Sequence, residues 1–209
     1  MIISLLFQNP VMFFAWAVSM VIAISIHECA HALAANSLGD PTAKLQGRLT
    51  LNPLSHLDLW GTLLLLFAGF GWGKPVPFNP YNLKNQKFGP AIISLAGPFS
   101  NFVLVLIFGL ILKYIYPLTG LGYESALFYF LYTLIIINAI LMAFNLIPIP
   151  PLDGSKLLYA ILPDSLDHIK ETLERYGFII LIVVIFFGGS IFGRFIGYVI
   201  NMVEKFIGL

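Results

Sequence analysis

Two histidines and a glutamate lie within five positions of one another in a strongly apolar stretch, as His27-Glu28-Cys29-Ala30-His31. Residues four apart share one face of an α-helix, so both imidazoles can bind one cation. Glu28 lies about 100° round the helix from His27 and about 60° from His31, so its carboxylate can reach a water molecule on that cation without being a ligand. This is the geometry of a hydrolytic zinc site.

A histidine pair in an apolar helix also has two simpler interpretations, helix packing and proton relay, because ionisable groups are costly there and serve several functions. We favour the metal site, since the acid stands at the position that a general base needs.

A catalytic zinc ion takes three protein ligands and keeps one position open. Outside the first predicted helix the candidates for the third ligand are His56, Asp58 and Asp153. Asp153 ends a stretch in which three prolines interrupt the helix and Gly154 permits a sharp turn. Such a break can return a carboxylate to the depth of the histidines, but the residues alone leave all three candidates open.

Composition indicates a polytopic membrane protein. Of the 209 residues, 59% are hydrophobic and 10% charged, and the mean hydropathy is +0.91. This length accommodates four to six crossings of about 20 residues each. The net charge of +1 and the lack of a basic stripe argue against nucleic-acid binding. A single cysteine, Cys29, excludes an internal disulfide, and no basic segment precedes the first helix, which we expect to be retained.

The first half of the chain predicts one long helix followed by irregular structure. The helix is expected from Pro10 to Leu38, because proline suits the first helical position and Gly39 the end. Partial alternation over 44–51 predicts a strand or short hairpin. The apolar piece Leu59–Phe70 is too short to span a bilayer, and prolines follow it, so 59–88 is predicted as a re-entrant or interfacial loop.

Two convincing spans follow, over 89–114 and 123–147, joined by a short turn that makes them antiparallel neighbours. A surface helix is predicted over 164–175, and the last apolar stretch, 178–209, forms either one crossing with an interfacial helix or two short helices. We therefore expect an all-α polytopic membrane protein of four to six transmembrane helices, with a short strand and re-entrant loop region after the first. It forms a single domain over 1–209, with a core over 10–160 and C-terminal helices over 163–209.

The positive charges predict the orientation in the cell membrane. If 59–70 does not cross, one side receives eight of the basic residues, whereas the only short connecting loop on the other side carries Lys113. The positive-inside rule makes the first side cytoplasmic, and His27 and His31 then lie towards the cytoplasm.

The chain resembles the site-2 proteases, the intramembrane zinc metalloproteases of peptidase family M50. The segment 27–31 matches the helix motif of that family, and Asn145, followed eight residues later by Asp153 and Gly154, matches its second signature. The segment 97–101 is a weaker match to a glycine-to-asparagine segment on the intervening helix. The resemblance spans residues 10–160. The chain differs from many members of the family, because its length leaves no room for the peptide-binding (PDZ) or nucleotide-sensing (CBS) domains that they carry.

This resemblance implies that His27, His31 and Asp153 hold one Zn²⁺ per chain and that Glu28 is the general base. Asn145 and Asn101 are candidates for the donor that stabilises an oxyanion, although both amides also suit interhelical packing. We expect neighbouring groups to hydrogen-bond the second ring nitrogen of each histidine, but the sequence does not identify these groups. His56 is a candidate for a loop contact with the substrate.

The expected substrates are transmembrane helices or membrane-retained peptides, cleaved within the lipid bilayer. The segment 44–51 offers an edge for an unwound substrate. The alternative function is that of a metal-binding membrane protein without hydrolysis, either a cation transporter or an inactive protease-like binding partner. Substrate identity, regulatory partners and homo-oligomerisation remain open.

Overall fold

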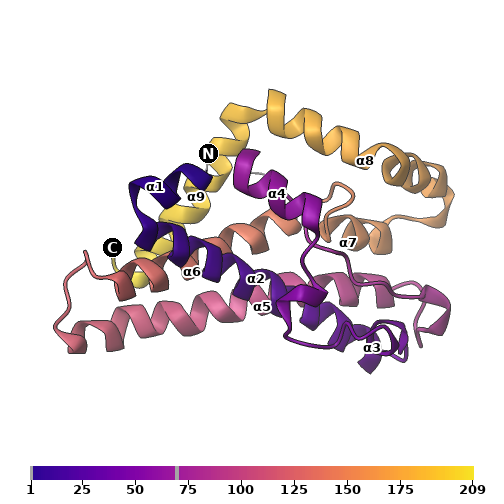
Figure 1. Ribbon diagram of the computed structural model, residues 1–209. Helices are drawn as coiled ribbons and strands as arrows, with labels where there is room; N and C mark the ends of the chain where they lie inside the picture. Colours follow the sequence, from indigo (N-terminus) through magenta and orange to yellow (C-terminus); the bar gives the residue numbers. More distant parts are fainter. Residues whose placement is uncertain (1, 69–70) are drawn as a thin grey trace.

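The computed structural model describes residues 2–68 and 71–209, and within these ranges the secondary structure is helical (Figure 1). A short helix, α1 (Leu5–Gln8), precedes the long α2 (Pro10–Ser37). The side chain of Asn9 caps α2 by accepting a hydrogen bond from the Met12 amide at 3.1 Å. Gly39, with φ of 107°, ends it in a conformation that side chains disfavour. The predicted first helix is therefore confirmed.

The segment after α2 differs from the prediction. No strand forms over the described residues of 44–51, because a single helical turn, α3 (Thr42–Leu45), occupies its start and Gly47 turns the chain at φ 68°. The only extended pairing among the described residues is an isolated antiparallel bridge between Leu57 and Gly73. The predicted strand was wrong, because a partial alternation over eight residues without a partner strand is weak evidence for a strand.

The apolar piece after residue 58 forms a short helix, α4 (Leu59–Ala68). Asp58 caps it by accepting a hydrogen bond from the Gly61 amide at 2.8 Å. At ten residues α4 is too short to span a bilayer, as expected. Gly69 and Phe70, which end the predicted apolar piece, lie outside the described residues.

Two long helices form the rest of the core. α5 (Gly89–Leu110) continues into a π-helical turn at Ile111–Ile115 and a 3₁₀ turn at Tyr116–Thr119. α6 (Ala126–Asn145) returns antiparallel to it, and Ser125 caps it through the Phe128 amide. α2, α5 and α6 all pack against one another. The buried face of α2 is made largely of alanine and serine, which allows close helix approach.

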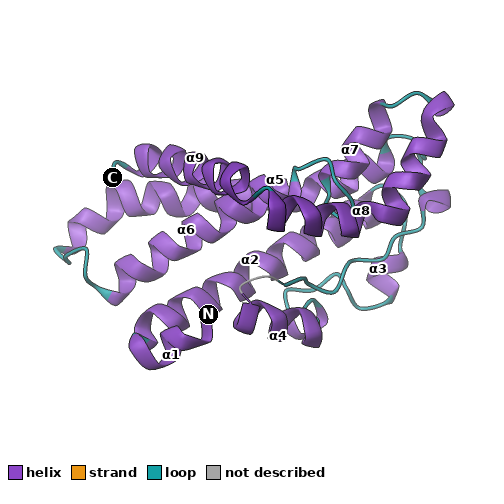
Figure 2. Ribbon diagram, turned by 90° about the horizontal axis from the view of Figure 1, so that it is seen from above, coloured by secondary structure: helices purple, strands orange, loops and turns teal. Residues whose placement is uncertain are grey.

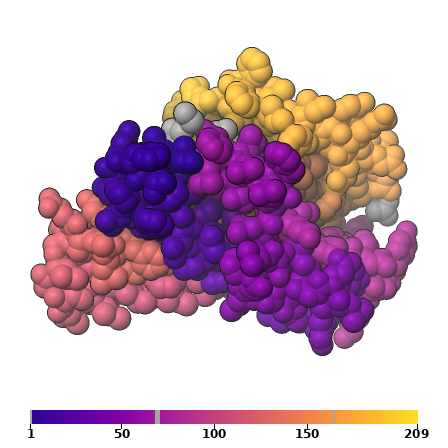
Figure 3. All heavy atoms as spheres, viewed as in Figure 1, coloured from indigo at the N-terminus to yellow at the C-terminus, as the bar shows by residue number. Residues whose placement is uncertain are grey.

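Three helices complete the chain, α7 (Gly154–Ile161), α8 (Asp167–Phe187) and α9 (Gly189–Ile207). The predicted surface helix and the apolar segment after it form one continuous helix, α8, which meets α9 at an angle of 85°. α9 packs along α6 and buries Val203 and Ile207 in the core cluster (Figure 2). In Figure 3 the yellow C-terminal helices, the indigo N-terminus and magenta α4 share one face.

Three helical segments are long and apolar enough to cross a membrane: Pro10–Ser37, Gly89–Thr119 and Ala126–Asn145. The bent pair α8 and α9 makes a fourth if it is counted as one span. The chain is thus an all-α polytopic membrane protein, with three or four spans against an expectation of four to six. Loops 38–58, 71–88 and 148–166 gather at one end of the bundle, and the turn 116–125 lies at the other (Figure 1).

Candidate active site

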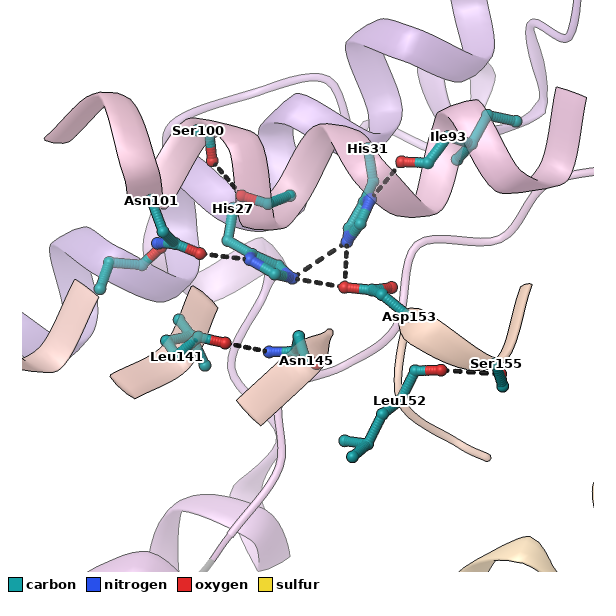
Figure 4. Close-up of polar contacts among 12 residues, drawn as sticks. His27, His31, Ile93, Ser100, Asn101, Leu141, Asn145, Leu152, Asp153 and Ser155 are labelled. Carbon is teal, nitrogen blue, oxygen red and sulfur yellow. Dashed lines mark hydrogen bonds and ion pairs between the residues drawn. The ribbon is translucent and has the colours of Figure 1, made fainter. Parts of the chain in front are cut away.

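Three side chains from two distant parts of the chain converge on one point (Figure 4). His27 and His31 come from successive turns of α2, and Asp153 precedes α7. The Nε2 atoms of the histidines are 3.0 Å apart, and Asp153 Oδ2 lies 3.2 Å from the first and 3.3 Å from the second. Both imidazoles are more than 90% buried. The structure therefore brings together one of the three candidate third ligands with the histidine pair.

The hydrogen bonds on the far side of each imidazole fix the tautomers. His31 Nδ1 lies 2.7 Å from the carbonyl oxygen of Ile93, which can only accept, so this nitrogen carries the proton. His27 Nδ1 lies 2.6 Å from Asn101 Oδ1, and it donates there because the amide nitrogen of Asn101 is engaged as a donor elsewhere. In the neutral histidines both Nε2 atoms therefore present lone pairs to Asp153.

This donor set fits a zinc ion. Three acceptor atoms stand at 3.0–3.3 Å from one another, and buried Asp153 Oδ2 has no hydrogen-bond donor. Such a cluster is repulsive unless a cation lies among the atoms. Ligands about 2.0–2.2 Å from a tetrahedral zinc are separated by about 3.3–3.5 Å, close to the distances found here.

Asp153 reaches the histidines because the chain breaks sharply after α6. A Cβ at Gly154 would lie 2.3 Å from the carbonyl oxygen of Leu146, so only glycine permits this turn. Burial by itself raises the pKa of Asp153, but protonated imidazoles at His27 and His31 would donate to the carboxylate and attract it, which lowers the pKa to about 2. A zinc ion in place of those protons would hold the carboxyl group ionised in the same way.

Close approach of α5 to α2 leaves room for the imidazoles only because residue 97 is glycine. A Cβ at Gly97 would lie 2.4 Å from His31 Nε2 and 2.6 Å from His27 Cε1. Real Cβ atoms do not approach other atoms so closely, and the ring positions are fixed at both ends. Gly97 thus forms one wall of the metal centre.

Glu28 and the three donors line one cavity of about 860 Å³ between α2, α4, α6 and α8. Most of the lining is apolar, with Asn145 and Lys156 as further polar members. The aromatic rings of Trp72 and Phe178 close it on one side, with their centroids 6.3 Å apart. A cavity of this size with a largely apolar lining and a few convergent polar groups is typical of a ligand-binding site.

A buried arginine stands behind Glu28. Arg48 is 5% exposed, attracts Glu28 electrostatically and donates a hydrogen bond from Nη2 to the carbonyl oxygen of Lys74. The Lys74 amide in turn donates to the carbonyl oxygen of His56 at 2.7 Å. These contacts hold the segment 71–76, here called the strap, over the cavity beside Glu28. Sequence reasoning counted Arg48 only as a positive loop charge.

The remaining predicted site residues are placed as follows. Asn101 is fully buried, and its amide donates to Asn138 Oδ1 at 2.8 Å and to the carbonyl oxygen of Ala23 at 3.4 Å, which leaves no hydrogen for an oxyanion. Asn145 lines the cavity and donates one hydrogen, to the carbonyl oxygen of Leu141.

The two loop candidates serve the framework. His56 is fully buried, and its Nε2 lies 2.8 Å from the carbonyl oxygen of Thr50, so its side chain supports the loop rather than facing the cavity. Asp58 caps α4 and is not brought to the histidines. The supporting groups that the sequence could not identify are Asn101 and the backbone carbonyl of Ile93, and no sequence signal marks the second.

Fold and site together define a class, that of polytopic helical membrane proteins with a buried cluster of two histidines and one carboxylate that could hold a metal ion. Comparison with known proteins identifies the family within this class. The model of peptidase family M50 matches residues 115–188. YwhC of Bacillus subtilis (strain 168), named as a zinc metalloprotease, is 41% identical over 170 residues, which cover 80% of this chain and 78% of that protein. The chain belongs to peptidase family M50, and its cofactor is zinc.

Two further relatives carry names of the same kind. Rip2 of Mycolicibacterium smegmatis is 31% identical over 79% of this chain and 64% of its own length. Zinc metalloprotease MJ0392 of Methanocaldococcus jannaschii is 28% identical over 90% of this chain, which spans 47% of that protein. No solved structure matches the chain.

Proposed function

We propose that this zinc metalloprotease is an intramembrane endopeptidase that hydrolyses peptide bonds in the transmembrane segments of membrane proteins. The observation that carries the proposal is the position of the three donors and Glu28 in one largely apolar cavity between helices of membrane-spanning length. A soluble peptide would gain little from such a lining, whereas an unwound transmembrane segment buries its side chains there.

His27, His31 and Asp153 are the residues that would hold zinc. Bound there, zinc supplies a Lewis acid that polarises a carbonyl oxygen and lowers the pKa of a water ligand to about 7. Glu28 follows His27 directly on α2 and lines the same cavity, so its carboxylate would take a proton from the attacking water and deliver it to the leaving amine. The Asn101 side chain and the Ile93 carbonyl keep both imidazoles in the tautomer that exposes Nε2.

Asn145 is the proposed donor to the oxyanion. Its amide has a hydrogen in excess of the bond to Leu141, and the side chain lines the cavity. Loss of one such donor typically reduces kcat by about 10²–10³-fold. Asn145→Ala is therefore expected to bind zinc normally and to cleave slowly.

The proposed orientation places the metal-centre end of the bundle towards the cytoplasm. The loops at that end and the helical turns beside them carry eight of the eleven lysine and arginine residues, whereas the other end has Lys113, just before the turn 116–125, and Lys205. Such asymmetry follows the positive-inside rule.

The deciding experiment measures zinc content and cleavage of a model transmembrane substrate in the same detergent-purified samples. Wild type is expected to hold one zinc ion and to cleave. Glu28→Gln should keep the zinc without cleaving, whereas Asp153→Ala should lose most of it. Asp58→Ala is the matched control, because this carboxylate caps α4 away from the centre. Zinc without cleavage in the wild type would instead support a metal-binding protein without hydrolysis.

A further inference from the structure

A second pocket, of about 550 Å³, opens beside the active-site cavity at the end of the bundle where loops gather. It lies between loop 78–90, α7 and the first turns of α8. We call it the lysine pocket, because its polar lining includes three lysines, Lys87, Lys156 and Lys170. Among the described residues that line it, no side chain is acidic. Its chemistry therefore suits an anion.

The lysine pocket adjoins the active-site cavity. Phe78 and Lys156 line both, one from the loop and the other from α7. Lys156 follows Asp153 by three residues, which is about 4.5 Å along a helix, and Tyr159 and Ala160 extend the lining to about 10 Å. A peptide extended at about 3.3 Å per residue covers that distance in roughly three residues.

Two of the three lysines, Lys156 and Lys170, form ion pairs with exposed acids and can exchange these partners. Lys156 pairs with Glu174 and Lys170 with Asp167, the second pair at 2.8 Å. The two acids are 46% and 62% exposed, so their pairs with the lysines contribute little to stability. An incoming carboxylate can replace either acid while the displaced acid returns to water.

We propose that the lysine pocket binds an acidic side chain of the substrate, roughly three to five residues from the scissile bond on the α7 side. This inference rests on the proposed function, since it needs a peptide at Asp153. The apolar cavity then holds the residues of the membrane span, and the lysine pocket holds the first carboxylate beyond it. The pair of sites thus selects unwound segments with an acidic flank at the membrane surface and sets the cleavage position relative to it.

The test uses full-length, zinc-loaded protein and a model transmembrane substrate in which aspartate, or asparagine of the same shape, is placed at each of five positions on both sides of the scissile bond. Aspartate is expected to raise kcat/KM over asparagine by about three- to tenfold at one or two adjacent positions, mainly through KM. The preference should fall as salt rises from about 0.05 to 0.5 M, because the Debye length shortens to a few ångström.

Variants of the lysine pocket test whether its lysines cause the preference for aspartate. The double variant Lys87→Gln, Lys170→Gln should bring the ratio of aspartate to asparagine kcat/KM close to one. Lys205→Gln, which alters an exposed lysine near the end of α9, should leave the ratio unchanged. A charge swap gives a positive readout, since Lys170→Glu should favour lysine at the same substrate position. The salt dependence of the wild type tests the proposal even if a variant does not fold.

Equal rates for aspartate and asparagine at every position, with cleavage intact, would overturn the inference and leave the proposed function standing. A failure to cleave any of the substrates would overturn the proposed function itself. A third outcome assigns the pocket to lipid: no flank preference, but faster cleavage in nanodiscs of phosphatidylglycerol than in phosphatidylcholine, abolished by the double variant. That result would also overturn the proposal.

Discussion

At the scale of single residues, the proposed metal centre depends as much on the groups that support the candidate ligands as on the candidate ligands themselves. Three hydrogen bonds in series connect His27 Nδ1 to the backbone of α6. His27 Nδ1 donates to Asn101, Asn101 donates to Asn138, and Asn138 donates to the Leu134 carbonyl oxygen. Because this carbonyl can only accept, it fixes the direction of all three hydrogen bonds. The series fixes one tautomer of His27 without using a charge. The series also connects α6, α5 and α2, so the same contacts hold the three helices together and orient the His27 imidazole.

Replacing Asn138 should weaken zinc binding although Asn138 does not contact zinc. Asn138→Leu keeps the approximate volume but leaves one Asn101 hydrogen without its acceptor, so the orientation of Asn101 against His27 is no longer fixed. We expect zinc affinity to fall by about ten- to 100-fold, as for other groups that support metal-bound histidines. Competition with a chelator measures this. Asn201→Leu, on the exposed side of α9, is the control, and equal affinities in the two variants would refute the role of the series.

Gly97→Ala should abolish the metal centre. The added methyl group meets both imidazoles at 2.4–2.6 Å, and neither ring can move without breaking its Nδ1 hydrogen bond. We expect loss of stoichiometric zinc and of activity, with a destabilisation of about 1–3 kcal/mol from overpacking. Gly193→Ala in α9 meets no atom within 4 Å and should be neutral. Retention of zinc by Gly97→Ala would show that α5 can shift away from α2.

The sequence could name candidate ligands because their chemistry is encoded in side chains at fixed helical spacing. His27, His31 and Glu28 were predicted from that spacing, and Asp153 was one of three open candidates until the resemblance favoured it. The structure brings His27, His31 and Asp153 together, and their roles stay predictions. The hydrogen bond between His31 and the Ile93 carbonyl could not be predicted from the sequence, because every residue type has a backbone carbonyl. Arg48 was missed because a lone arginine in a polar loop is usually exposed, and only tertiary packing buries this one.

At the scale of elements, two short loops hold the ends of the long helices and cover the site. Asp40, directly after α2, is fully buried and accepts hydrogen bonds from Thr42, Asn79 and Asn82. It therefore joins the end of α2 to the loop that leads into α5. The strap is held in the same way by Arg48. Neither arrangement contains a strand, and the alternation over 44–51 misled the prediction because a buried arginine and a turn glycine interrupt it.

Asp40 should make stability depend on acid pH. Burial raises the pKa of Asp40, but hydrogen bonds from Thr42, Asn82 and Asn79 outweigh this and hold it below its ordinary value of 3.8. Since the folded pKa is the lower one, the stabilisation is present above pH 3.8 and is lost as the pH falls through the folded pKa. Asp40→Asn, which turns an amide donor towards other donors, should destabilise by about 1–3 kcal/mol at pH 7.

Thermal unfolding at a series of pH values checks this prediction. The difference between wild type and Asp40→Asn should shrink below pH 4, because protonation of Asp40 removes the same acceptors. Asp167→Asn, at a carboxylate that is 62% exposed, should follow the wild type throughout. A difference that stays constant down to pH 2 would contradict the prediction, because the stabilisation would then not depend on the ionised form of Asp40.

Arg48 should act through the strap rather than through zinc. Arg48→Met keeps the apolar stem but removes the hydrogen bond to Lys74 and the positive charge near Glu28. Hydrogen bonds to charged groups contribute about 1.5–3 kcal/mol, so we expect kcat/KM to fall by about ten- to 100-fold with zinc content unchanged. Lys44→Met, at an exposed position of α3, is the control. Loss of zinc in Arg48→Met would place the arginine among the supports of the metal ligands instead.

At the scale of the whole molecule, the three core helices make a rigid frame, and the C-terminal pair closes its open side. α8 packs on the proline-rich turn so tightly that a Cβ at Gly177 would lie 2.5 Å from Pro150 Cβ, and it contributes Phe178 and Leu181 to the cavity lining. The sequence left two predictions open for the last apolar stretch, one crossing with an interfacial helix or two short helices, and the 85° bend between α8 and α9 fits either of them. The start of α8 was placed wrongly, because this helix joins a charged surface segment to an apolar one.

The orientation of this frame gives the last prediction. With Cys29 replaced by alanine, single cysteines at Thr119 and at Lys84 report the two ends of the bundle. Thr119 lies at the turn after α5, and Lys84 lies in the loop at the metal-centre end. Because the basic residues gather at the second end, a membrane-impermeant maleimide should label Thr119→Cys in intact cells and Lys84→Cys only after permeabilisation. The reverse pattern would place the lysine pocket and the metal centre on the outer side, where an acidic substrate flank would have to be extracellular.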